Sequence, residues 1–154
     1  MTPIEVRAIS AAETRPLRQS VLRPTQRPDE LVYAGDDDVE TLHAGAFVEG
    51  RLAGIASICR EPPPGERDAG AWRLRGMATT PERRRSGLGR RLLDACFAHV
   101  AARGGTRVWC NARVTAADFY LAYGFVVLGE PFELPHIGPH YLMWRAVAPA
   151  PRPP

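Results

Sequence analysis

The sequence predicts a mixed α/β fold in which short strands come first and helices are interleaved with the later strands. Apolar residues occur in short runs, as in strands, and prolines and glycines separate these runs. One longer segment has apolar side chains at the spacing of a helix face: Leu88, Leu92, Ala95, Cys96 and Val100. This order of elements favours layers of sheet and helix over a regular doubly wound fold.

Length and composition indicate one globular domain. The chain has 154 residues, of which 45% are apolar and 24% are charged, as is usual for globular proteins. A chain of this length can bury a core without disulfides or metals. We therefore expect a single domain over residues 1–147, followed by a proline-rich tail over residues 148–154 that is expected to be disordered.

The first half of the chain is expected to contain one helix and most of the strands. The expected strands are residues 4–9, 41–47, 52–58 and 72–78, and the expected helix is residues 11–22. Glu49, Gly50 and Arg51 separate the second strand from the third, which favours a hairpin. Residues 23–38 and 61–70 are rich in proline, glycine and charge, so both are expected to be loops.

The second half begins with the clearest helix, over residues 88–102, which Gly104 and Gly105 end. A strand over residues 106–110 follows. Thr115 can cap a short helix that Gly124 closes. The last expected elements are strands at residues 125–128 and 141–146, joined by a long loop over residues 129–140.

The three cysteines and the lack of a long apolar run bear on the compartment. Cys59, Cys96 and Cys110 are an odd number without metal-ligand spacing, so we expect reduced thiols, no metal and a cytoplasmic protein. No run of about 18 apolar residues is present, and the N-terminus lacks the pattern of a secretory signal. We therefore expect no membrane association.

The basic residues exclude some function classes. All 20 are arginine, which excludes a lysine Schiff base and a Walker-type phosphate loop with its lysine. The net charge of +3 is too small to argue for nucleic acid by itself. Five arginines nevertheless fall between Arg83 and Arg91, so the excess of positive charge is local.

These arginines belong to a turn, residues 83–91, that leads into the long helix. The start of a helix presents backbone N–H groups and the positive end of the helix dipole. Glycines let the backbone approach a ligand, Ser86 can cap the helix, and arginines add forked donors. The turn therefore predicts a pyrophosphate site, with a tight turn at a solvated basic helix end as the alternative. The dinucleotide-binding fingerprint is not matched, because its third glycine is missing.

Residues 74–93 closely resemble motif A of the GNAT family of acyl-CoA-dependent N-acetyltransferases, and Arg84, Gly87 and Gly89 hold the defining positions. Residues 117–125 resemble motif B of the same family, in which a Phe-Tyr pair precedes a Gly-Phe pair. The spacing between the two motifs also fits.

The resemblance extends over residues 4–147, and the first half is also similar to a bacterial subgroup of the family. The features of this subgroup are Leu17-Arg18 followed by residues 21–24, the acidic step at residues 35–37, and Pro139-His140.

The resemblance implies a mixed sheet of about six or seven strands flanked by about four helices. The sheet would be splayed between the strands at residues 72–78 and 106–110, with acetyl-CoA in the opening. A backbone N–H near Met77 or Ala78 would support the oxygen of the thioester as it becomes an oxyanion. The implied cofactor-binding residues are Met77, Ala78, Thr79, Arg84, Arg85, Ser86, Gly87, Leu88, Gly89, Arg90 and Asn111.

Tyr120 matches the family's general acid, which protonates the leaving thiolate. A tyrosine with a pKa of about 10 suits that role, and a core aromatic is the alternative. Residues 72–75 lack the carboxylate that family members often place there as a base. His140 is the candidate base in its place.

Other candidates for the base are His136, Glu130 and Glu133, and an ordered water could replace any of them. His43 lies in an apolar strand and is expected to be structural. Cys110 has no partner placed by the sequence, and we expect a small buried hydrophobe rather than a nucleophile.

Taken with the resemblance, the sequence predicts an N-acetyltransferase that moves an acetyl group from acetyl-CoA to a primary amine. The acceptor would be a small molecule or a peptide, and Asp36, Asp37 and Asp38 either attract the amine or face solvent. A non-catalytic acyl-CoA-binding regulatory module is the alternative. Nucleic acid binding is not expected, because the arginines lack neighbouring aromatic or groove-entering elements. Dimers are common in the family, so a second copy of the chain is a candidate partner.

Overall fold

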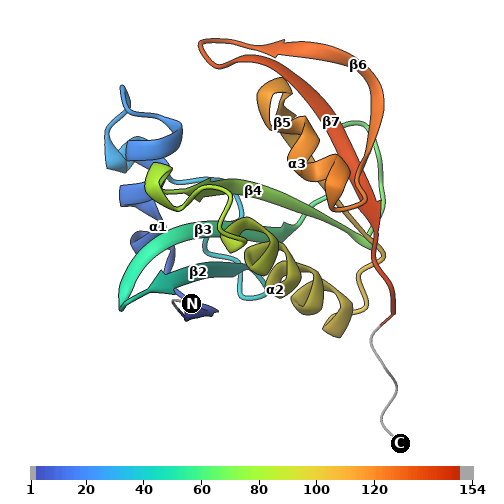
Figure 1. The fold of residues 1–154 in the computed structure, drawn as a ribbon. Helices are drawn as coiled ribbons and strands as arrows, with labels where there is room; N and C mark the ends of the chain where they lie inside the picture. The colour runs from blue at the N-terminus through green and yellow to red at the C-terminus, as the bar shows by residue number, and fades with distance from the viewer. Residues whose placement is uncertain (1–2, 150–154) are drawn as a thin grey trace, which may run out of the picture. The chain divides into compact units, whose positions relative to one another are not determined.

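The computed structural model describes residues 3–149. Figure 1 shows the ribbon with its helices and strands labelled. The chain divides into two compact units, and the divisions fall after Arg60, after Arg73 and after His99. The first unit comprises Met1–Arg60 and Leu74–His99, and the second comprises Glu61–Arg73 and Val100–Pro154. From residue 150 onward, the tail predicted over residues 148–154 lies outside the described residues.

The first unit contains most of the strands that the sequence predicts. Its elements are β1 (Ile4–Ala8), α1 (Ala11–Leu17), β2 (Leu42–Val48), β3 (Arg51–Arg60), the C-terminal part of β4 (Ala71–Thr79) and most of α2 (Leu88–Ala102). The strands are hydrogen-bonded in the order β1-β2-β3-β4, and the first two pairs are antiparallel. The predicted hairpin is confirmed: Glu49 and Gly50, with φ of 52° and 77°, form its two-residue turn.

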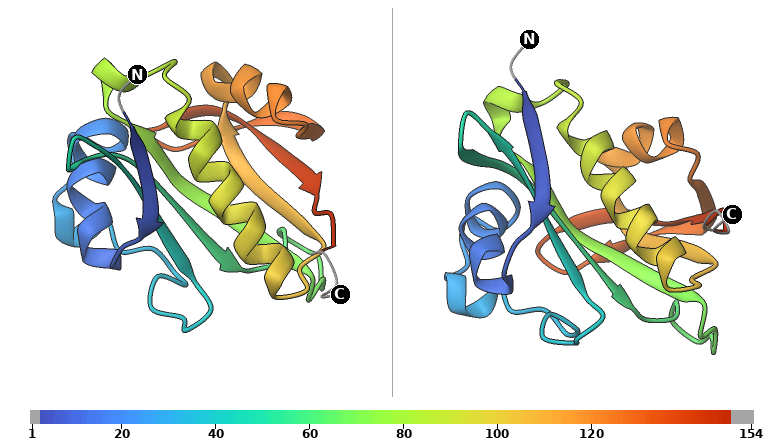
Figure 2. Two further views of the ribbon diagram at one scale, coloured as in Figure 1. Left: turned by 60° about the horizontal axis from the view of Figure 1, so that its bottom comes forward. Right: turned by 90° about the horizontal axis from the view of Figure 1, so that it is seen from below.

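Helices α1 and α2 cover opposite faces of β3 (Figure 2). Ile55 packs against Leu17 of α1 in a buried apolar cluster. At the adjacent Gly54, a Cβ would lie 3.1 Å from Leu92 of α2. Because successive residues of a strand face opposite sides of the sheet, the two helices form separate layers around β3.

The first helix is shorter than the sequence predicts. Ser10 and Glu13 form a capping box, with Glu13 N–H donating to Ser10 Oγ over 3.1 Å and Ser10 N–H donating to Glu13 Oε1 over 2.9 Å. The expected helix over residues 11–22 is an α-helix only to Leu17, and a π-helical turn follows at Arg18–Leu22. Pro16 lies inside the helix and removes a backbone donor, so the helix loses a hydrogen bond near its end.

The second unit contains the remaining strands of the sheet and the short helix α3. Its elements are the N-terminal part of β4, β5 (Arg107–Arg113), α3 (Ala117–Ala122), β6 (Val126–Leu134) and β7 (Gly138–Ala146). The strands are hydrogen-bonded in the order β4-β5-β7-β6, with β4 parallel to β5 and the other two pairs antiparallel. The largest side chains of its core are at most 1% exposed: Trp72, Trp109, Phe125 and Met143.

The short helix α3 differs from the prediction at its start. Its N-cap residue is Ala116, without a side-chain hydrogen bond, so the expected cap at Thr115 is wrong. A 3-10 turn over Val114–Ala116 leads into the helix instead. The expected end is confirmed: Gly124 has φ of 94°, and Phe125 N–H donates to the Tyr120 carbonyl over 3.0 Å.

The long loop expected over residues 129–140 is also wrong. Strand β6 continues to Leu134 and β7 begins at Gly138, so most of this segment is a hairpin. Gly129, with φ of 79°, and Pro131 lie in a register shift between Leu128 and Phe132. β6 ends the strand order, and a bulge in an edge strand tolerates both residue types.

Residues 3–149 thus contain seven strands and three α-helices, with short 3-10 and π-helical turns between them. This confirms the mixed α/β class. Within the same residues, every helix is too short or too polar to cross a membrane.

Candidate functional site

The end of β4 is the first part of the candidate site, and two glycines shape it. Gly76 has φ of 66°, a departure from extended backbone just before Met77 that we call the bend of β4. Gly54 lies on the neighbouring strand β3, where a Cβ would lie 3.2 Å from the Thr79 methyl group and 3.1 Å from Leu92. The absence of a side chain at Gly54 therefore lets β3, the end of β4 and α2 pack closely.

The turn between β4 and α2 is the second part. It starts with a 3-10 turn at Pro81–Arg83 and contains two left-handed positions, Arg85 with φ of 62° and Gly87 with φ of 87°. The Arg91 N–H donates to the Gly87 carbonyl over 3.1 Å, so Gly87 stands at the helix N-cap. Ser86, the expected cap, instead donates its hydroxyl to the Arg83 carbonyl.

The geometry of this turn suits an anion. The first turn of α2 leaves backbone N–H groups without acceptors inside the helix, and its dipole adds positive charge. A Cβ at Gly87 would meet nothing within 4 Å, so the backbone there is open to a ligand. The side chains of Arg84, Arg85 and Arg90 are exposed around it, whereas Leu88 is buried and anchors the helix start. The residues present therefore fit a pyrophosphate group.

Arg91 has a different role from these three arginines. Its guanidinium donates to the Ile4 carbonyl over 3.1 Å and so ties α2 to β1. The turn and the β4 end, including Met77, Ala78 and Thr79, all belong to the first unit.

Tyr120 lies on α3 in the second unit and is 7% exposed. Its ring packs edge-on against Phe125, with 5.3 Å between the ring centroids. Tyr123 is the C-cap residue of the same helix, and the guanidinium of Arg145 stands 4.6 Å from its ring centroid. Tyr123 therefore has a packing partner on β7.

Asn111 and Cys110 lie inside β5 rather than at its end, because the strand continues to Arg113. Asn111 is opposite Leu142 of β7 and is partly buried. Burial raises the pKa of the Cys110 thiol to about 12, although the charge of Arg73 opposes this. Little thiolate forms at neutral pH, which agrees with the expected role as a small buried hydrophobe.

His140 lies in β7 rather than in a loop, and it is 3% exposed. Its Nδ1 is 2.8 Å from the Gly138 carbonyl. A carbonyl only accepts, so Nδ1 carries the proton and Nε2 holds the lone pair of the neutral ring. His136 is exposed in the β6–β7 turn with φ of 65°, and Glu130 and Glu133 are exposed on β6.

The acidic step holds a buried ion pair, which the sequence did not reveal. Asp36 is 7% exposed and accepts two hydrogen bonds from Arg18, over 2.7 and 2.9 Å. The charge of the Asp36 carboxylate is therefore balanced by Arg18 inside the protein, and Asp36 does not attract an amine. Asp37 and Asp38, in contrast, are exposed. His43 is structural as expected: its Nδ1 is 2.7 Å from Ser57 Oγ, and its Nε2 is 2.9 Å from the Asp36 carbonyl.

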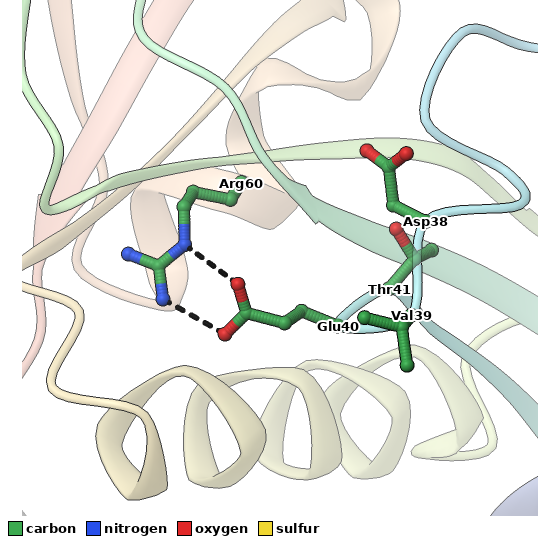
Figure 3. A pocket seen from close by; sticks show the side chains of 5 residues that line it. All are labelled: Asp38, Val39, Glu40, Thr41 and Arg60. Carbon is green, nitrogen blue, oxygen red and sulfur yellow. Dashed lines mark hydrogen bonds and ion pairs between the residues drawn. The ribbon is translucent and has the colours of Figure 1, made fainter.

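A shallow hollow of about 280 Å³ lies beside this step and is lined by Asp38, Val39, Glu40, Thr41 and Arg60 (Figure 3). Arg60 forms a fork with Glu40 across it, over 3.2 and 3.0 Å. Both side chains are more than a third exposed. None of these residues belongs to the β4 end or to the turn before α2.

A family model described as an acetyltransferase (GNAT) domain matches residues 24–140 of this sequence. The chain belongs to the GNAT acetyltransferase family. It is 37% identical over 144 residues to an N-acetyltransferase of Bacillus subtilis (strain 168), described as uncharacterized and called YitI. That alignment covers 94% of this chain and 97% of the relative.

Solved structures of GNAT acetyltransferases share the fold at lower sequence identity. The ribosomal-protein-S18-alanine N-acetyltransferase of Escherichia coli has a TM-score of 0.74 and 17% identity, over 97% of each chain. An aminoglycoside 6′-N-acetyltransferase in complex with coenzyme A has a TM-score of 0.69 and 16% identity, over 96% of this chain and 99% of that one. The resemblance inferred from the two motifs is thereby confirmed.

The sequence analysis did not single out three residues that lie near the end of β4: Gly54, Gly76 and Arg18. The two glycines have a recognisable signal, because an isolated glycine in a strand pattern often marks a bulge or a close backbone approach. Arg18 had only a weak signal, as a charged residue among the apolar positions of the first helix.

The buried ion pair predicts a specific dependence of stability on pH. Burial alone would raise the pKa of Asp36, but hydrogen bonds from Arg18 and from the Tyr33 N–H, together with the charge of Arg18, hold it below its usual value. A carboxylate with a lowered pKa stabilises the fold above its unfolded pKa of about 3.9, and this contribution is lost as the pH falls through the folded pKa. Asp36→Asn should lower the free energy of unfolding at pH 7 by about 3–5 kcal/mol, because it leaves a buried guanidinium unpaired.

Urea unfolding between pH 7 and pH 3 measures this effect. The gap in stability between the wild type and Asp36→Asn should shrink below about pH 4. Asp37→Asn, in the exposed next residue, is the matched control and should change stability by less than about 0.5 kcal/mol. A gap that stays constant over the whole range would contradict the prediction.

Proposed function

We propose that this GNAT acetyltransferase transfers the acetyl group of acetyl-CoA to a primary amine on a small molecule or a peptide. The turn before α2 carries the proposal. It is exposed, it contains two left-handed residues, and it leads directly into the N-terminus of a 15-residue helix flanked by arginines. This arrangement binds a pyrophosphate through backbone N–H groups, and the CoA-bound structural neighbour supports the same ligand here.

The cofactor-binding residues proposed from the motif are those of the β4 end and the turn, together with Asn111. When bound, acetyl-CoA supplies the acetyl group as a reactive thioester. The backbone of Met77 and Thr79 would pair with the pantetheine arm, and an N–H near Met77 or Ala78 would stabilise the oxyanion.

Two proton transfers complete the reaction. The amine nitrogen bonds to the carbonyl carbon and the C–S bond breaks, so the amine loses a proton and the sulfur gains one. We assign the second transfer to Tyr120, whose phenol donates its proton to the departing thiolate. We assign the first to the Nε2 of His140, with an ordered water as the alternative, since the ring is buried and its Nδ1 donates to the Gly138 carbonyl.

Calorimetric titration with acetyl-CoA tests the proposal most directly. We expect micromolar affinity for acetyl-CoA and none for ATP or NAD under the same conditions. Thiol release is then followed over polyamines, amino sugars, amino acids and peptide N-termini. Binding without turnover over this panel would support a non-catalytic acyl-CoA-binding module, and no binding would overturn the proposal.

Gly87→Asp should abolish binding of acetyl-CoA. The substitution places a side chain and a negative charge where the pyrophosphate would bind, and it strains a backbone with φ of 87°. Gly50→Asp is the matched control, because Gly50 also has a positive φ, 77°, and also has nothing within 4 Å of its Cβ position. The control should bind acetyl-CoA normally, and equal affinities for the two variants would undo the assignment of the turn.

Tyr120→Phe should lower kcat by roughly 10²–10⁴-fold while the affinity for acetyl-CoA is retained, because only the proton donor is removed. Tyr123→Phe removes the same hydroxyl from the C-cap residue of that helix and serves as the control, with an expected kcat near that of the wild type. Steady-state rates of thiol release give kcat, and calorimetry gives the affinity. Unchanged turnover in Tyr120→Phe would remove this residue from the acid role.

A further inference from the structure

Four polar side chains of the first unit form a buried cluster, which we call the Arg18 cluster: Arg18, Asp36, His43 and Ser57. Arg18 is 0% exposed. Besides the fork to Asp36, its guanidinium donates to the Leu31 carbonyl over 2.8 Å and to Ser57 Oγ over 3.0 Å. The terminal nitrogens thus have acceptors, and only Nε lacks a hydrogen-bond partner.

The unpartnered side of Arg18 faces the bend of β4. A Cβ at Gly76 would lie 3.3 Å from Arg18 Nε and 3.4 Å from the ring of Tyr33. The Arg18 guanidinium in turn lies 4.0 Å from the centroid of the Tyr33 ring. Guanidinium and ring therefore pack close to the backbone at Gly76, where a side chain would make tight contacts and the φ of 66° also favours glycine.

Tyr33 is connected to the cluster and to β4. Its N–H donates to Asp36 Oδ2 over 2.9 Å. The guanidinium of Arg75, the residue before Gly76, lies 4.2 Å from the centroid of its ring. The loop that carries Tyr33 and Asp36 is therefore attached to β4 at two successive residues.

The bend needs such support, because glycine adopts positive and negative φ about equally well. Gly76 alone does not select φ of 66°, and the chain around it must do so. A buried guanidinium held by several acceptors is a rigid support, since moving it would leave hydrogen-bonding groups unpaired in the protein interior. Exposed side chains would not provide the same constraint.

We propose that Arg18, held by Asp36, is a positioning residue that fixes the bend at Gly76 and thereby orients the backbone of Met77, Ala78 and Thr79 for acyl-CoA. The part of this inference that concerns acyl-CoA rests on the proposed function. The part that concerns β4 does not, so the two are tested separately. This positioning role would also explain the Leu17-Arg18 pair and the acidic step, whose residues take no part in the proposed reaction.

Hydrogen exchange followed by mass spectrometry tests the effect on β4, without any ligand. In Asp36→Asn, we expect the amides of residues 74–80 to exchange roughly 10-fold faster or more, because the support beneath them is loosened. Glu40→Gln, in the exposed fork of Figure 3, is the matched control and should leave these amides unchanged. Ile58→Val is a second control that lowers stability by removing a buried methyl group, with no polar partner lost.

A double variant, Arg18→Met with Asp36→Leu, separates positioning from stability. Replacing both members of a buried ion pair by apolar residues often restores the stability that a single substitution loses. We expect the double variant to unfold at a urea concentration close to that of the wild type, and yet to retain the fast exchange over residues 74–80. If Asp36→Asn does not fold, the double variant alone decides the question.

Calorimetry with acetyl-CoA provides the second readout. The double variant should bind acetyl-CoA roughly 10- to 100-fold more weakly than the wild type, as expected for a displaced binding backbone. Wild-type exchange and wild-type affinity in the double variant would overturn the inference. If wild-type protein does not bind acetyl-CoA, the proposed function fails, and the exchange experiment still decides whether Arg18 fixes the bend.

Discussion

The burial of the Arg18 guanidinium is the constraint that organises the first unit. A fully buried charge requires acceptors on its donor groups, and here they come from separate parts of the chain. Leu31 and Asp36 lie in the loop after α1, and Ser57 lies on β3. His43 on β2 then links Ser57 to the backbone of Asp36. A long loop without an α-helix or strand of its own thereby obtains a fixed path along the sheet.

The turn before α2 differs from the Arg18 cluster, because its polar groups of interest belong to the backbone and not to side chains. A strand, a turn with left-handed residues and a helix N-terminus follow one another directly along the chain. In the proposed function, their N–H groups and the helix dipole are the binding elements, and the arginines add charge around them. The residue types in the turn matter chiefly because they leave the backbone accessible, as the lack of a side chain does at Gly87. The positions of these N–H groups depend on the direction in which β4 enters the turn. The bend at Gly76 sets that direction, so it also affects the turn.

This difference explains how much the sequence could predict. The turn and α2 are local in the chain, so spacing and residue type located them, and the observed bounds of α2 match the predicted ones. The β2–β3 hairpin was predictable for the same reason. The fork between Arg18 and Asp36 joins residues 18 positions apart, and no local pattern shows that an aspartate in a proline-rich region is buried.

The predictions at Thr115 and after Leu128 were wrong because the local sequence signals there did not decide the structure. A 3-10 turn replaces the expected cap of α3. Gly129 and Pro131 are typical of loops, and the chain instead accommodates them in a bulge of an edge strand. Pairing with β7 over the rest of β6 therefore outweighs the local preference of these two residues, an outcome that depends on contacts the sequence does not display.

The acceptor is the property that the fold leaves open. The structural neighbours named above are described as acting on a ribosomal protein and on aminoglycosides, and they share this fold at less than 20% identity. A fold that serves such different acceptors specifies the transfer and not the amine. In this chain the three consecutive aspartates Asp36, Asp37 and Asp38 also contribute less net negative charge than their number suggests, because Arg18 pairs with Asp36. Of these three aspartates, only Asp37 and Asp38 present a carboxylate to solvent.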